Sequence, residues 1–210
     1  MASKLSIYSG ALRALGERRL SSLTEDRASR RELDDAYDDV VANCLEAGYW
    51  NFAMRTVELE ASTDAEPQFG YSYAFEKPTD WVRTFNISAD ERFGTPLDDY
   101  NDEGSWFFCD VEPLYLRYVS NDADFGLNLT NWPRSFVTFV ETALAHVIVL
   151  NVTGSSEKWD MLDKRLRRER MRAKASDAMN EPPGRMPEGT WVRSRDGGLR
   201  TRSRWNGRFS

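Results

Sequence analysis

Four carboxylates close together in the middle of the sequence are the side chains most suited to catalysis. They are Asp98, Asp99, Asp102 and Glu103. Two neighbouring carboxyl groups can serve as general acid and as nucleophile or base in glycoside hydrolysis. The chain has 34 acidic residues, however, so some clustering follows from composition alone. We interpret this segment as a solvent-exposed loop and keep a glycan-cleaving enzyme as the alternative function.

The remaining residue types that support catalysis or metal binding are sparse. His146 is the only histidine, and it falls within an apolar helical segment, where a packing or contact role is more common than catalysis. Cys44 and Cys109 are too few for a disulfide framework, so we predict two buried free thiols. The sequence contains no zinc, nucleotide or nicotinamide motif. We therefore predict no catalytic, metal or cofactor site, and a protein that is not an enzyme.

Basic side chains are concentrated in the last quarter of the chain. Residues 155–210 carry 15 Lys/Arg and 8 Asp/Glu, whereas residues 1–154 carry 13 and 26. An acidic body with a basic end is typical of an interaction arm, and Arg and Trp are enriched at interface hot spots. We predict these docking residues: Arg165, Arg168, Arg172, Arg193, Arg195, Arg200, Arg202, Arg204 and Trp205.

A basic arm suits either nucleic acid or protein. Lys and Arg neutralise phosphates, and the Arg guanidinium also pairs with protein carboxylates. We favour a protein partner because DNA-binding proteins are more often basic overall, and because the acidic body repels DNA within the screening length of about 8 Å. A DNA-binding accessory protein and a solvated arm without a partner remain alternatives.

Hydrophobic periodicity predicts four helices that carry or position these residues. The first covers residues 4–15 and ends at Gly16, and the second covers residues 30–48 and ends at Gly48. The third begins at Pro133 and is apolar on more than one face, so we expect it to be central. The fourth covers residues 156–179. Its apolar stripe fades after Leu166, so we expect its end to extend past the core.

Short aromatic and β-branched runs between the second and third helices predict an antiparallel β subdomain. The predicted strands are 56–59, 70–75, 81–87, 105–108 and 114–119. The predicted fold class is α+β: a four-helix bundle (1–51 and 132–180), an inserted antiparallel β subdomain (52–131) and an extended C-terminal tail (181–210). No uninterrupted apolar run approaches the roughly 18–20 residues of a membrane span, and no signal peptide is evident, so we expect no membrane partner.

Several short motifs occur in a definite order along the chain. They are Leu15–Glu17 with Ser21–Leu23; Tyr37, Asp38 and Leu45; Trp50–Ala53 with Val57–Leu59; Tyr73, Pro78, Asp80 and Arg83; Tyr115–Tyr118; Phe136 and Ala143–Ala145; and Thr153–Ser155. In order and spacing, this set resembles the head–tail adaptor proteins of short-tailed bacteriophages, of the tail tubular protein A type. The resemblance covers about 160 residues and leaves out the C-terminal tail.

The resemblance implies a structural virion protein made in the bacterial cytoplasm. It implies a homo-oligomeric ring of twelve copies that docks under the portal protein through C-terminal segments. The β insertions would face the tail nozzle protein, with tail fibres as a further partner. Genomic DNA would pass through the ring without sequence-specific binding. The alternative function then becomes a virion-associated glycan-cleaving enzyme that uses the carboxylates of the β insertion.

Overall fold

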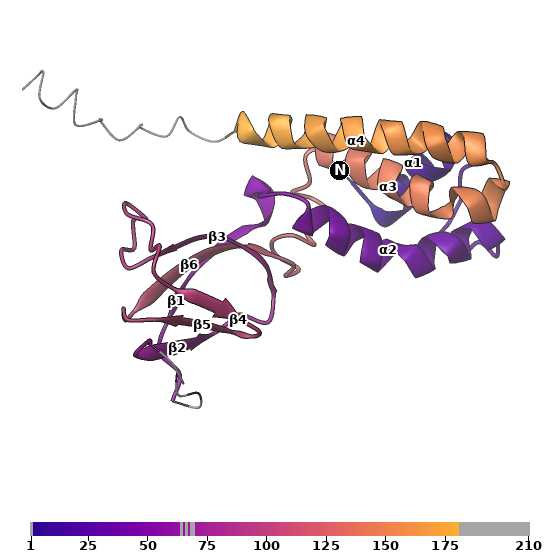
Figure 1. The fold of residues 1–210 in the computed structure, drawn as a ribbon. Coiled ribbons are helices and arrows are strands. Elements are labelled where there is room, and N and C mark those ends of the chain that lie inside the picture. Colours follow the sequence, from indigo (N-terminus) through magenta and orange to yellow (C-terminus); the bar gives the residue numbers. More distant parts are fainter. Residues whose placement is uncertain (1, 64, 66, 68–69, 181–210) are drawn as a thin grey trace, which may run out of the picture. The chain divides into compact units, whose positions relative to one another are not determined.

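The computed structural model describes residues 2–63, 65, 67 and 70–180, and it is a mixed helix and sheet protein (Figure 1). The elements are α1 (Lys4–Leu15), α2 (Ala28–Glu46), a 3₁₀ turn (Asn51–Ala53), β1 (Met54–Leu59), β2 (Tyr73–Glu76), β3 (Trp81–Ser88), β4 (Asn101–Glu103), β5 (Trp106–Cys109), β6 (Leu114–Ser120), α3 (Arg134–Thr153) and α4 (Ser156–Ala178). The α+β class is therefore confirmed.

Local signals in the sequence account for four of the eight ends of helices α1 to α4. Ser3 forms a capping box with Ser6 at the start of α1, and Gly16 ends that helix in the left-handed conformation. Gly154 adopts the same conformation after α3, and the Ser155 side chain accepts a hydrogen bond from the Lys158 amide at the start of α4.

The end of α2 differs from the prediction. The helix ends at Glu46, and its last cap is Ala47 in a right-handed conformation, so Gly48 is not the helix-ending residue. A Cβ at Gly48 would lie 3.0 Å from the Trp50 ring, so this glycine makes room for the indole. The Trp50 Nε1 donates to the carbonyl oxygens of Cys44 and Leu45, at 2.9 and 3.1 Å. A buried tryptophan therefore satisfies the carbonyl groups that helix ends leave free.

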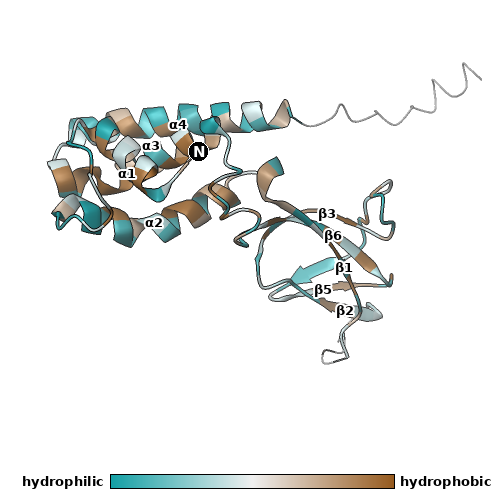
Figure 2. Ribbon diagram, turned by 180° about the vertical axis from the view of Figure 1, so that it is seen from behind, coloured by the Kyte–Doolittle hydropathy of each residue, from teal (hydrophilic) through white to brown (hydrophobic). Residues whose placement is uncertain are grey.

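Helix α3 is central among the helices, as predicted, because α1, α2 and α4 all pack against it. Its length and composition would allow it to cross a membrane, although 56% of its most apolar window is buried in the protein. The prediction from uninterrupted apolar runs missed this, because Glu141, Thr142 and His146 interrupt the run although the helix as a whole is apolar. Figure 2 shows the contrast with α4, which is hydrophilic along much of its length.

The strands form two antiparallel sheets of three strands each, in the orders β1-β6-β3 and β2-β5-β4. Their side chains enclose a hydrophobic cluster separate from that of the helices, with Phe75, Phe107 and Tyr118 among its fully buried members. Five strands match predicted runs. The sixth, β4, lies within the segment predicted to be a loop, because backbone pairing with β5 holds it although its side chains are all exposed.

The end of α4 contradicts the prediction that this helix extends past its core. Ala173 and Asp177 are only 1% and 6% exposed. The Asp177 carboxylate accepts a hydrogen bond from the Asn51 amide at 2.9 Å, and its carbonyl oxygen accepts one from the Asn51 side chain at 3.0 Å. The apolar stripe does not end after Leu166. It continues through Ala173, whose small side chain allows close packing.

The predicted free buried thiols, Cys44 and Cys109, are confirmed.

Candidate interaction surface

The basic residues predicted on α4 differ in their exposure to solvent. Arg165 is partly buried, and its charge acts on Glu141, whose side chain packs against Gly10 of α1. Arg168 and Arg172 are exposed and form no ion pair within the described residues. The row therefore offers two cations that are open to a partner. The other predicted docking residues lie outside the described part of the chain: Arg193, Arg195, Arg200, Arg202, Arg204 and Trp205.

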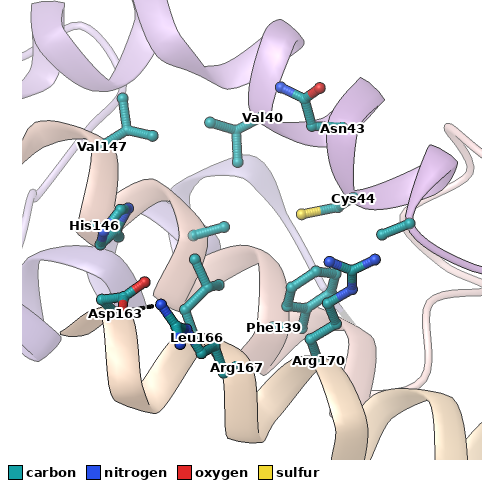
Figure 3. Close-up of a pocket in the computed structure, with 12 residues that line it drawn as sticks. Val40, Asn43, Cys44, Phe139, His146, Val147, Asp163, Leu166, Arg167 and Arg170 are labelled. Atoms are coloured by element: carbon teal, nitrogen blue, oxygen red, sulfur yellow. Dashed lines mark ion pairs between the residues drawn. The ribbon is translucent and has the colours of Figure 1, made fainter. Parts of the chain in front are cut away.

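A groove runs between α2 and α4, with α3 as its floor (Figure 3). Its volume is about 390 Å³. The side chains that line it are Val40, Asn43, Cys44, Ala47, Phe139, Ala143, His146, Val147, Asp163, Leu166, Arg167 and Arg170. The floor is apolar and the rim is polar, a distribution common to sites that bind ligands or partner side chains.

The rim of the groove has more positive than negative groups. Asp163 pairs with Arg167 at 2.9 Å, one helical turn away. Arg170 is exposed and has no ion pair within residues 2–180. The His146 Nε2 atom is buried without a hydrogen-bond partner in the described structure, and its ring lies 5.0 Å from the Trp159 ring. The groove can thus accept a carboxylate at the end of an apolar side chain. Within the described residues, the Arg170 guanidinium has no ion pair and the His146 Nε2 atom has no hydrogen-bond partner.

Cys44 lies on the floor of this groove but is unsuited to act as a nucleophile. Burial raises the pKa of its thiol to about 12, and the nearby charge of Arg170 lowers it only in part. The thiolate is the reactive form of cysteine, so the group is protonated near neutral pH. Cys44 therefore contributes apolar surface rather than chemistry.

Sequence reasoning missed the groove because its polar residues come from three separate helices. His146 was predicted to have a packing or contact role, and Arg170 is not among the predicted docking residues. One signal was available: Asp163, Arg167 and Arg170 follow each other at helical spacing, on a different side of α4 from Arg165 and Arg172. The groove itself depends on how α2 and α4 pack on α3, which no local pattern specifies.

The four candidate catalytic carboxylates are all exposed and are not gathered in one site. Asp99 accepts a hydrogen bond from the Tyr71 hydroxyl, Asp102 pairs with Lys77, and Glu103 accepts one from the Asn101 side chain. Within the described residues, no cluster of three or more His, Cys, Asp or Glu side chains is placed to hold a metal ion.

No protein-family model matches this sequence, and no curated protein matches it. The arrangement of the described residues therefore carries the functional argument, together with the order of short motifs in the sequence.

Proposed function

We propose that this chain is a structural virion protein: the ring-shaped head-to-tail adaptor that joins a portal to a tail nozzle and lets DNA pass. The proposal rests on the ordered motifs that resemble tail tubular protein A adaptors. The order of the elements is compatible with it, because two helices are followed by strands and then by two more helices. We further propose that the four helices act as one bundle and that twelve copies close the ring.

The observation that carries the proposal is the exposed basic side of α4 on an otherwise acidic chain. Arg168 and Arg172 have no ion pair within the part of the chain that the structure describes, although residues 1–154 contain twice as many acidic as basic residues. A helix that needed these cations only for its own fold would pair them with the available carboxylates. We infer that a partner outside the chain supplies the anions. The proposed portal-docking set is this row with Arg165 and the basic residues of the C-terminal segment.

The acidic strands suit a conduit for DNA. Residues 54–120 contain 5 Lys/Arg and 14 Asp/Glu. A channel surface with the same negative charge as the phosphates repels DNA over the screening length of about 8 Å, so DNA passes without adhering to it. We propose that part of this acidic surface lines the channel.

A truncation after Met179 tests the portal contact. We expect the shortened protein to keep its fold, because the described helices and sheets lie before that point, and to lose binding to purified portal in a pull-down. Electron microscopy of the full chain mixed with portal should show a ring at the portal vertex. Arg92→Ala, which removes an exposed cation far along the chain from α4, serves as the matched control and should bind normally. Unchanged portal affinity of the truncated protein would contradict the docking assignment.

A further inference from the structure

The outward side of α4 carries a stripe of exposed residues with heptad spacing. Met161, Lys164, Arg168 and Met171 follow each other at intervals of three, four and three residues, so they lie on one side of the helix. The two methionines are 57% and 68% exposed. Neither cation has an ion pair within residues 2–180. Apolar and charged residues that alternate in this way are typical of the seam between packed helices.

The outward side of α2 carries a stripe of opposite charge. Asp35, Asp39, Ala42 and Glu46 are all exposed and lie along one side of the helix. The three carboxylates form no ion pair within the described residues, although the same helix pairs Asp34 with Arg30 elsewhere. Selective pairing on the inner side leaves the outer carboxylates available to another molecule.

The two stripes lie on opposite sides of α3 within one chain. Helices α2 and α4 each pack against α3 and flank it in both ribbon views (Figures 1 and 2). The buried residues of α2 and α4, such as Leu33 and Leu162, face inward, so the two stripes face outward. The stripes of one copy therefore cannot meet each other.

We propose that the α4 stripe of one copy packs against the α2 stripe of the next copy. Lys164 and Arg168 would face Asp35 and Asp39, and the methionines would contact Ala42. A contact between two different surfaces is heterologous, and it closes into a ring when the rotation between copies allows it. The inference rests on the proposed function and refines it. Arg168 goes to the neighbouring copy, whereas Arg165, Arg172 and the C-terminal segment remain for the portal.

The complementary charges identify the occupant of the α4 stripe as a second copy. The C-terminal segment of the same chain is a poor occupant, because residues 181–210 hold 7 Arg and 3 acidic residues and so repel the cations of α4. A contact over about three turns of two helices is smaller than the roughly 1,200 Å² of a stable interface. We therefore expect weak pairwise association that closure of a ring strengthens.

A charge exchange between the two stripes tests this proposal. One variant combines Asp35→Lys with Asp39→Lys, and the other combines Lys164→Glu with Arg168→Glu. Each variant alone presents stripes of like charge, so its self-association should weaken at least about tenfold. An equimolar mixture should recover association close to that of the unmodified chain, because unlike stripes then alternate. Arg92→Glu changes an exposed cation outside the helices and serves as the control.

Sedimentation velocity at high protein concentration measures the association. We expect self-association of the unmodified chain at about 10 mM salt, where the screening length is about 30 Å, and its loss at about 1 M, where it is about 3 Å. Circular dichroism checks that both variants are folded. An unmodified chain that stays monomeric, single variants that associate normally, or a mixture that fails to recover would each overturn the proposal. A chain that associates in this way but does not bind portal would instead refute the proposed function alone.

Discussion

The Asp80 carboxylate offers the sharpest test of how the sheets are held together. It lies just before β3 and is 12% exposed. It accepts hydrogen bonds from the Tyr118 hydroxyl at 2.9 Å, from the Ser120 hydroxyl, and from Arg55 at 2.9 Å. Arg55 lies on β1, whereas Tyr118 and Ser120 lie on β6. One carboxylate thus joins the three strands of a sheet, and we expect Asp80→Ala to destabilise the fold strongly.

The structure sets the magnitude of that effect. Tyr118 and Ser120 are fully buried, and a buried hydroxyl that loses its acceptor costs about 1–3 kcal/mol. The Arg55 side chain is 36% exposed, so solvent screens this pair and it contributes about 0–1 kcal/mol. These contributions share one acceptor and do not add, so we expect a loss of about 3 kcal/mol. For a chain of this size that lowers Tm by about 6–12 °C.

The pH dependence of this loss of stability separates the contribution of the Asp80 charge from that of the side-chain shape. Burial acts to raise the pKa of Asp80, but hydrogen bonds from Ser120, Arg55 and Tyr118 outweigh it and lower that pKa. A carboxyl group with a lowered folded pKa stabilises the fold above its unfolded pKa of about 3.9, and this contribution disappears as the pH falls through the folded value. The difference between Asp80→Asn and the unmodified chain should therefore be largest at neutral pH and shrink on acidification.

Urea unfolding followed by tryptophan fluorescence measures these free energies. Asp98→Asn, which alters an exposed carboxylate, should change the free energy of unfolding by no more than about 0.5 kcal/mol. An Asp80→Ala protein as stable as this control would refute the account of the carboxylate as the link between strands. An Asp80→Asn difference that persists unchanged at low pH would refute the assigned role of its charge.

Three further predictions follow from buried contacts. Gly126→Ala should cost about 2 kcal/mol by urea unfolding, because its Cβ would lie 2.1 Å from a backbone oxygen; Gly94→Ala, which meets only a flexible side chain, should be nearly neutral. Cys44 should resist a thiol reagent at pH 8 until the protein unfolds, because burial raises its pKa to about 12; rapid labelling of the folded protein would contradict this. Asp177→Ala should speed amide exchange in the last turns of α4 because it removes the link to the 3₁₀ turn. The exposed neighbour Ser176→Ala should not.

The sequence predicted the elements well where the signal was local. Helix α1 was predicted with its observed bounds, and Gly16 ends it for the expected conformational reason. Strand β4 was missed because its residues are Asn, Asp and Glu, which carry no strand signal, and only the partner strand β5 supplies their hydrogen bonds. Hydrophobic periodicity thus identifies an element that buries its own side chains. It cannot identify a strand such as β4, which is held only by backbone hydrogen bonds to a neighbouring strand.

The candidate surface was predictable in composition but not in geometry. The charge count identified α4 as basic, but the count cannot say which cations find an internal partner. Arg167 pairs with Asp163 on the same helix, and Arg165 faces a carboxylate of α3, whereas Arg168 faces outward. The end of α4 was mispredicted because Ala173 is a weak hydrophobic signal that nonetheless packs closely. Tertiary packing therefore decides which basic residues remain available.

Repulsion between the positive charges of α4 destabilises this helix in an isolated chain, and this supports a role in assembly. Residues 164–174 contain seven cations and one carboxylate. Like charges one helical turn apart, such as Lys164 with Arg168 and Arg168 with Arg172, each destabilise a helix by a few tenths of a kcal/mol. Few residues of this helix are buried, so packing compensates only in part. Carboxylates from a neighbouring copy would remove the repulsion and add ion pairs, so association and helix stability would increase together.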